Sequence, residues 1–307
     1  MRVVITGPTG AIGHALINKC IENHDEVLAI CHKGSKRVKT IPKNSLVKIL
    51  ELDCDEYAFF SDSYDNSFGK YDVFFHFAWG FTTGEGRNDV FQQSLNIQYS
   101  LDAVKLAYTF GCCVFIGAGS QAEYGRVNFS LKADTPANPE NGYGIAKLCS
   151  GQLTRILCSQ LGIKHIWTRV LSVYGPYDGE NTLVISSLKK MLKNEDISLT
   201  KGEQIWDFIY CSDAANAMYL VATKGMNGKT YVIGSGESDY LKFYIEGMKK
   251  ISGSDSFLDF GAIPYSDKQV MHLCADISEL NNDTGFVPVV SFEDGIKETV
   301  KYIKERI

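Results

Sequence analysis

The sequence predicts an α/β protein with a doubly wound parallel sheet and a smaller mixed α/β lobe toward the C-terminal end. Over the first third of the chain, short apolar runs alternate with longer amphipathic stretches. This alternation is typical of strands joined by crossover helices, which build a parallel sheet covered on both faces. After Tyr174 the alternation becomes irregular, and a loop rich in Pro, Gly and Asn, YGPYDGEN, follows. The change in pattern predicts a second, smaller lobe.

The elements of the sheet are predicted from their own residues. The expected strands are 3–6, 26–31, 47–52, 73–77, 112–117 and 165–170, and the expected helices are 12–23, 89–110, 143–161, 183–193 and 292–305. We assign 1–172 to the sheet domain, with a later segment around 205–235 that returns to it, and 173–307 mainly to the lobe. Ligands of such sheets bind at the carboxyl ends of the strands, so the site is expected there.

Composition excludes several classes of function. The chain has 307 residues and a net charge of −5, so it has no basic field to attract nucleic acid. No apolar run approaches the roughly 20 residues of a membrane span, and we expect no membrane association. The nine cysteines are scattered without a CxxC pair, which predicts neither a disulfide framework nor a metal site. We therefore expect reduced thiols, a cytoplasmic protein and no bound metal.

The motif ITGPTGAIG predicts a Rossmann-type dinucleotide site. Gly7, Gly10 and Gly13 follow a strand and open a helix, where they serve a tight turn, close approach of a pyrophosphate and helix packing. The start of that helix directs free N–H groups and a positive dipole end at the phosphates. Thr9, Ala11 and Ile12 complete the predicted phosphate-binding turn. A plain glycine-containing loop is the alternative.

The end of the second strand favours NADP(H) over NAD(H). An acidic residue at this point binds the ribose 2′-hydroxyl, whereas a basic residue accepts a 2′-phosphate. Here His32, Lys33 and Arg37 follow the strand and no acid does. A solvated basic loop is the alternative. Asp53, after the third strand, is a candidate for the adenine amino group or a simple turn residue.

Three residues form a candidate proton-transfer set. Tyr143 and Lys147 are four residues apart, which places them on one face of a helix. A neighbouring ammonium stabilises the phenolate and lowers the pKa of a tyrosine, so that it can exchange a proton as hydride moves. Ser120 follows the fifth strand and is expected to hold the substrate oxygen. Each residue has a structural alternative, either a surface helix pair or a turn serine.

On these motifs the chain resembles the extended short-chain dehydrogenase/reductases, the NAD-dependent epimerase/dehydratase group that acts on nucleotide sugars. The resemblance extends over TGPTGAIG, FHFAWG, GSQAEYG, YGIAK, TRVLSVYGP and GEQIWDFIYCSDAANA. It implies that Ser120, Tyr143 and Lys147 are catalytic, and it implies a homodimer formed through helices 89–110 and 143–161. The further residues that it implies are Phe77, Ala78, Trp79, Asn96 and Val170 for the cofactor, and Thr82, Gln121, Tyr174, Asn181, Thr182, Leu183 and Trp206 for a nucleotide-diphosphate sugar.

Some of these residues keep more than one interpretation. Asn96 could hold a helix kink, hold a water that resupplies the proton, or lie on a helix surface. His76 is interpreted as a strand end, and Trp79 and Trp167 as core or cleft-wall aromatics. Trp206 stands where many members of the family have an arginine for the sugar-nucleotide phosphates, so Lys189, Lys190, Lys201 or backbone N–H groups would have to take that role.

Three reactions of the resembled family compete, together with a non-catalytic dinucleotide sensor. A 4,6-dehydratase carries an Asp-Glu pair directly after its Ser/Thr, whereas this chain has Gln121 and Ala122, with Glu123 one place too late. A 4-epimerase retains NAD, which the absent acid after strand two disfavours. A sensor often lacks the Tyr or Lys, and both are present. The distal half is most similar to reductases that make abequose and related 6-deoxyhexoses for surface polysaccharide, which implies NAD(P)H-dependent reduction of a nucleotide-linked 4-keto-6-deoxyhexose.

Overall fold

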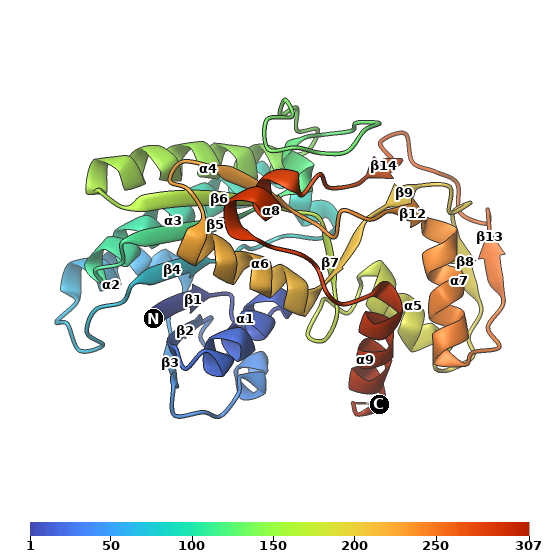
Figure 1. Ribbon diagram of the computed structural model, residues 1–307, viewed down its shortest axis with the longest axis horizontal. Coiled ribbons are helices and arrows are strands. Elements are labelled where there is room, and N and C mark those ends of the chain that lie inside the picture. Colours follow the sequence, from blue (N-terminus) through green and yellow to red (C-terminus); the bar gives the residue numbers. More distant parts are fainter. Residues whose placement is uncertain (307) are drawn as a thin grey trace.

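A seven-stranded parallel sheet forms the centre of the molecule (Figure 1). The computed structural model describes residues 1–306, and its sheet has the strand order β11-β6-β5-β4-β1-β2-β3. The strands are β1 (Arg2–Thr6), β2 (Glu26–Cys31), β3 (Val47–Glu51), β4 (Val73–His76), β5 (Val114–Ser120), β6 (Lys164–Val170) and β11 (Thr230–Ile233). The predicted Rossmann-type α/β fold is confirmed, and the strand order places the switch point between β1 and β4.

Helices cover both faces of this sheet. On one face, α1 (Ala11–Glu22), α6 (Cys211–Lys224) and α8 (Ser278–Thr284) bury residues such as Leu16 and Met218 against the strands. On the other face lie α2 (Tyr57–Ser63), α3 (Val90–Thr109) and α4 (Gly142–Leu161), with Val104 and Cys158 in the core. Each fully buried large aliphatic side chain contributes about 1.5–3 kcal/mol, so both layers hold the strand ends firmly in place.

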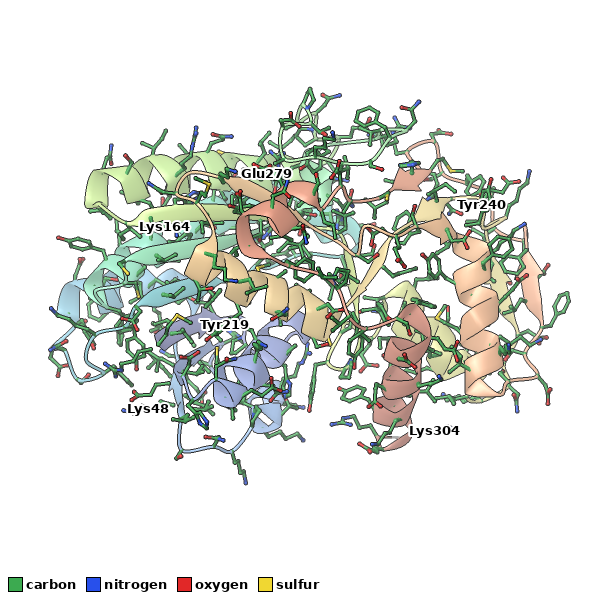
Figure 2. All side chains as sticks on the ribbon, viewed as in Figure 1. Lys48, Lys164, Tyr219, Tyr240, Glu279 and Lys304 are labelled. Carbon is green, nitrogen blue, oxygen red and sulfur yellow. The ribbon has the colours of Figure 1, made fainter. Side chains whose placement is uncertain are left out.

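A second region is built mainly from residues after β6. It contains α5 (Leu183–Met191), α7 (Leu241–Ser252) and α9 (Phe292–Lys304), which pack around Leu188, Met248 and Ile296. Three small sheets border these helices: β7 (Ser172–Tyr174) with β10 (Phe208–Tyr210), β8 (Ile197–Leu199) with β13 (Leu258–Phe260), and β9 (Ile205–Trp206) between β12 (Asp239–Tyr240) and β14 (His272–Leu273). Figure 2 labels Tyr219, which belongs to α6, and Tyr240, which ends β12 next to α7.

The last third of the chain contributes to both regions. The strand β11 joins the edge of the large sheet beside β6, and Leu280 and Phe286 pack into the same core as α1. The Asp207 carboxylate is fully buried and accepts hydrogen bonds from the backbone N–H groups of Ser235, Gly236 and Ala275 at 2.8, 3.1 and 3.0 Å. One carboxylate therefore ties the start of β10 to the two segments that return to the sheet.

Two of the differences from the predicted elements lie between residues 1 and 172. The fifth strand extends to Ser120 instead of ending at 117, so Ser120 is the last strand residue and not a residue after it. The seven-residue helix α2 was not predicted, because its segment lacks a clear 3.6-residue apolar period. Among the described residues, no helix is both long enough and apolar enough to cross a bilayer.

Candidate active site

The glycine turn between β1 and α1 has the geometry of a phosphate cradle. Gly7 has φ +66°, and a Cβ there would lie 2.9 Å from Ala78 N, at the end of the neighbouring strand β4. A Cβ at Gly13 would lie 2.4 Å from Gly7 O, so the helix packs on the turn. At Gly10 the nearest atom would be 3.8 Å away, which leaves room for a ligand. No side chain caps α1, and its first N–H groups suit a pyrophosphate. These residues fit the dinucleotide that the motif predicts.

The ends of β1 and β4 are joined by a small polar network. Thr6 Oγ1 accepts hydrogen bonds from Phe77 N and Ala78 N at 3.1 and 3.2 Å, and lies 3.0 Å from His76 Nδ1. Burial, with a smaller effect of the Lys147 charge, lowers the pKa of His76 to about 3. The imidazole is therefore neutral at physiological pH, and it links the ends of β4 and β1, in line with its interpretation as a strand-end residue.

Asn96 fixes the loop that follows β4. Its Oδ1 accepts from Gly80 N at 3.0 Å, and its Nδ2 donates to Gly80 O at 3.1 Å. The side chain is buried, so it is not a surface residue of α3. The sequence did not predict this role. The Asn96 amide bonds both the N–H and the carbonyl of Gly80, as a neighbouring strand would, and thereby sets the position of Trp79.

Ser120, Tyr143 and Lys147 come together at the carboxyl edge of the sheet. Ser120 ends β5, and α4 begins one residue before Tyr143, where the Asn141 side chain accepts from Gly144 N and caps the helix. Burial raises the pKa of the Tyr143 phenol, while the nearby Ser120 hydroxyl and then the Arg87 guanidinium act in the opposite direction. Lys147 Nζ donates to Ala118 O at 2.6 Å and lies 5.8 Å from the centre of the Tyr143 ring.

The Lys147 ammonium is buried, at 4% exposure. Burial lowers its pKa to about 7, and the Glu123 carboxylate opposes this shift. A lysine with this pKa is close to the point at which it loses its charge at neutral pH. Within this set the charge of Lys147 is therefore the one that changes near neutral pH, whereas burial holds the pKa of Tyr143 above its ordinary value.

Glu123 holds the backbone of Ser120 in place. The carboxylate is fully buried and accepts from Ser120 N at 2.8 Å, Arg169 Nε at 2.8 Å and Trp167 Nε1 at 3.1 Å. It joins the end of β5 to β6, and both of its oxygen atoms are engaged by the protein. Trp167 is buried, which favours the core over the cleft wall among the two interpretations left open by the sequence. Sequence reasoning did not identify Arg169 as the partner, because the pair is 46 residues apart.

Arg87, which the sequence did not single out, lies over Tyr143. Its guanidinium carbon is 4.3 Å from the centre of the tyrosine ring, and Nη1 donates to Thr82 O at 3.0 Å. Trp79 meets the same tyrosine edge to face, with ring centres 6.1 Å apart. The predicted Thr82 thus contributes its backbone carbonyl to this wall. An arginine in a loop just before a capped helix was the only signal in the sequence.

Most of the predicted substrate residues lie next to Ser120 or at the start of α5, whereas Tyr174 is buried. Gln121 follows Ser120 directly, Thr182 is the residue before α5, Leu183 is the first residue of that helix, and Asn181 is exposed beside it. Tyr174 is a correction: only 1% of it is exposed, and its ring packs on Phe208, Tyr210 and Phe292 within the core of the second region. Its phenol donates to Phe292 O at 3.2 Å, so this side chain does not face a ligand.

Trp206 and Val170 lie where the two regions meet. Trp206 is half-buried, its Nε1 donates to Ser172 Oγ at 2.8 Å, and its side chain packs against two hydrophobic clusters. Val170 ends β6 directly opposite Ser120 in the parallel register. Lys189, which was considered for the phosphates, forms an ion pair with Glu180.

The basic loop after β2 is paired with local acceptors. His32 contacts Asp53, Lys33 contacts Glu56, and the Arg37 guanidinium donates to Tyr177 O. Asp53 Oδ1 also accepts from Lys33 N at 2.9 Å. The side chains of His32 and Lys33 remain exposed to solvent, by 77% and 50%. A 2′-phosphate at this loop would have to compete with Asp53 and Glu56 for these cations.

The chain is similar in sequence and in fold to known enzymes of nucleotide sugars. The model of the NAD dependent epimerase/dehydratase family matches residues 3–234. A provisionally named UDP-glucose 4-epimerase of Methanocaldococcus jannaschii is 26% identical over 98% of each chain. The CDP-abequose synthase of Salmonella typhimurium is 27% identical over 68% of this chain and 69% of its own. The fold matches that of the Thermus thermophilus UDP-glucose 4-epimerase in complex with NAD, with a TM-score of 0.88 and 20% identity over the full length of both chains.

Proposed function

The chain is an enzyme of the NAD-dependent epimerase/dehydratase family, which acts on nucleotide sugars, and within this family we propose that it reduces the 4-keto group of a nucleotide-linked 4-keto-6-deoxyhexose. The observation that carries the proposal is the position of Glu123. Among residues 121–124, which follow Ser120 in the chain, it is the only acid, and it is enclosed by Arg169, Trp167 and the backbone. No carboxylate directly after Ser120 is free to remove water from a sugar, whereas a complete proton-transfer set is present.

The proposed mechanism assigns one task to each residue. The hydride for the carbonyl carbon of the sugar would come from a reduced nicotinamide, which the carboxyl edge of the sheet would hold next to Ser120 and Tyr143. Tyr143 gives its phenolic proton to the carbonyl oxygen as that oxygen becomes a hydroxyl, and Ser120 donates a hydrogen bond to the same oxygen. The Lys147 ammonium stabilises the resulting phenolate. The turn from Gly7 to Gly13 holds the pyrophosphate.

We further propose that NADP(H) is preferred over NAD(H). The support is the absence of an acid at the end of β2 and the exposure of His32 and Lys33 there. In this proposal the 2′-phosphate takes the two cations from Asp53 and Glu56. Arg37 stays with Tyr177 O and joins the loop to the second region.

A homodimer is proposed through the outer faces of α3 and α4. The two helices pack on each other and carry exposed apolar side chains that the fold leaves uncovered. These residues are Val90, Phe91, Leu95, Ile145, Leu153 and Ile156. Light scattering of the wild type and of Phe91→Asp tests the proposal, since a dimer through this face becomes a monomer in the variant. The cytoplasmic location stays a prediction from the cysteine pattern.

The function is tested with the purified full chain. The protein is mixed with NADPH or NADH and with CDP-, dTDP-, GDP- or UDP-linked 4-keto-6-deoxyhexose, and the absorbance of the reduced nicotinamide is followed. We expect oxidation with one of the sugars and a loss of about 10²–10⁴-fold in Tyr143→Phe. Tyr219→Phe is the matched control, because Tyr219 donates to Asp25 at 2.7 Å, far from the carboxyl edge of the sheet.

A nucleotide-sugar 4-epimerase is the second candidate. It is favoured by the full-length similarity to the Methanocaldococcus jannaschii protein. Copurified NAD, interconversion of ordinary UDP-hexoses and no net oxidation of NADPH with any keto-sugar would establish the epimerase and overturn the reductase. Cofactor binding that survives Tyr143→Phe, with no turnover by the wild type of any sugar, would leave the non-catalytic sensor.

A further inference from the structure

Lys147 is a buried ammonium without a carboxylate partner. Among the described residues, no acidic oxygen lies within ion-pair distance of Nζ, and its hydrogen-bond acceptor is the carbonyl of Ala118 at 2.6 Å. The nearest acid, Glu123, is already engaged by Arg169. Burying an isolated ammonium is costly, and such a group tends to lose its proton. The Glu123 charge favours the ammonium without forming an ion pair with it, so a closer contact must supply the rest of the stabilisation that the charged form needs in the proposed reaction.

The face of Trp79 occupies the position of that missing partner. Lys147 Nζ lies 3.7 Å from the centre of the indole ring, which is well within the range of a cation–π contact. Such contacts are strongest with tryptophan and with a cation that has lost its water. Among the described residues, Trp79 is the only tryptophan with a cation over its ring.

The indole is held in this orientation by a buried amide. Trp79 Nε1 donates to Gln93 Oε1 at 3.0 Å. Gln93 Nε2 in turn donates to Phe81 O at 3.0 Å and Gly86 O at 2.9 Å. The Gln93 side chain from α3 is 2% exposed, so both ends of the amide are satisfied in the interior. This arrangement leaves the ring little freedom to turn away from Lys147.

We propose that Trp79 is a positioning residue, whose indole face keeps the Lys147 ammonium charged and directed at Tyr143, with Gln93 fixing the ring. The proposal rests on the proposed catalytic function of Tyr143 and Lys147. It explains how Lys147 can stay charged beside Tyr143 without an ion-pair partner. It also explains why two buried amides, Gln93 and Asn96, tie the loop after β4 to α3.

The charged and titratable groups around Lys147 come from four elements. Tyr143 is one turn away on α4, and Glu123 follows β5 and is paired with Arg169. His76 from β4 is neutral, and Arg87 before α3 lies over Tyr143. Burial lowers the pKa of Lys147 to about 7, and Glu123 opposes the shift. Tyr143 also meets Trp79 edge to face, with ring centres 6.1 Å apart, so the Trp79 variants are titrated in Tyr143→Phe as well, where a change in the Lys147 midpoint reports on the indole.

The titration of Lys147 is measured directly, without substrate. In protein labelled with ¹³C-lysine, the Cε resonance of Lys147 is assigned by its loss in Lys147→Met and followed against pH. We expect a midpoint near 7 for the wild type and a midpoint lower by about one pH unit or more in Trp79→Leu. Trp79→Phe should lie between them, because a smaller π face remains. Phe59→Leu, on the exposed side of α2, should match the wild type.

A second series avoids the risk that Trp79→Leu fails to fold. At position 79 alone, tryptophan is replaced by analogues with one to four ring fluorines, which withdraw charge from the π face and keep its shape, while Trp167 beside Glu123 stays unchanged. The Lys147 midpoint should fall step by step with the number of fluorines. A midpoint that stays constant across this series overturns the proposal, even if activity falls.

The same measurements separate this proposal from the proposed function. If Lys147→Met retains full turnover of the nucleotide sugar, the catalytic assignment is wrong, although the effect of Trp79 on the Lys147 titration stands. If Lys147→Met is inactive and the Trp79 variants titrate as the wild type, the catalytic assignment stands and the function of Trp79 does not.

Discussion

The edge of the sheet at β5 and β6 and the loop after β2 both hold acids paired with bases, but the two pairs differ in their access to water. Glu123 and Arg169 are buried beneath Ser120, with side chains 0% and 7% exposed. Lys33 and Glu56 lie in solvent, with side chains 50% and 37% exposed. A buried pair cannot exchange its partner without leaving a charge in the interior, whereas a solvated pair exchanges at little cost. The buried pair therefore keeps a fixed geometry beneath Ser120, and the solvated pair can release its cation, as the proposed contact with a 2′-phosphate requires.

The largest expected effect comes from breaking the buried pair. Arg169→Leu leaves the Glu123 carboxylate without its cation, so the free energy of unfolding should fall by about 3–5 kcal/mol in urea titrations. The double variant Glu123→Gln with Arg169→Leu should recover part of this loss, because no unpaired charge remains. A loss of less than about 1 kcal/mol in Arg169→Leu would show that the two regions do not differ as described.

The next effect is a loss of folding stability at acidic pH, caused by His165, the buried histidine of β6. Burial lowers the pKa of His165 to about 4, and its Nδ1 has no partner. In the unfolded chain the histidine pKa is near 6.5, so between pH 6.5 and pH 4 the unfolded chain binds more protons than the folded one. The contribution of neutral His165 to the free energy of unfolding is therefore complete above pH 6.5. It is lost as the pH falls toward 4, at about 1.4 kcal/mol per pH unit. His165 stacks between Phe115 and Trp167.

His165→Phe should preserve that stack and remove the titration. Urea midpoints measured between pH 7 and pH 4 should consequently fall less steeply in the variant than in the wild type. Equal slopes would mean that His165 accepts a proton in the folded state. Stability at pH 7 should change little, because Thr154 Oγ1 keeps its bond to Ser150 O at 2.6 Å.

A smaller effect is expected at the loop after β2, and it concerns the cofactor and not stability. Lys33→Glu should weaken NADPH binding by roughly 10-fold or more and leave NADH binding within about twofold, since charge-assisted contacts to phosphate contribute about 1.5–3 kcal/mol. Lys48→Glu on β3 is the control of equal charge (Figure 2). Fluorescence titration of both cofactors gives the ratio, and equal losses for NADPH and NADH would contradict the 2′-phosphate assignment.

The smallest effect is expected for the stability of the same loop. Lys33→Ala removes the contact with Glu56, yet the urea midpoint should stay within experimental error, because solvent and salt screen an exposed pair. The comparison with Arg169→Leu in the same buffer is the measurement. A matching loss of stability in both variants would mean that the loop is as rigid as the buried edge.

The sequence alone determined the parts of this protein that depend on local pattern. The strands followed from apolar runs, because a buried parallel sheet requires them. The glycine turn followed from the spacing of its glycines, because a close approach of the backbone requires glycine at those positions. Tyr143 and Lys147 were placed on one helix face by their separation of four residues. These features need no knowledge of distant residues.

The tertiary structure decided which side chains meet across the sheet. Glu123 is one residue away from a dehydratase position in the sequence, yet it is Arg169 and Trp167, more than forty residues later, that enclose it. Tyr174 lies in a motif that resembles a substrate loop, but aromatic residues far along the chain bury it. Trp79 and Lys147 are 68 residues apart, and the packing of α3 and α4 at the ends of β4 and β5 brings them within 3.7 Å. Such contacts depend on long-range packing, which local spacing does not encode.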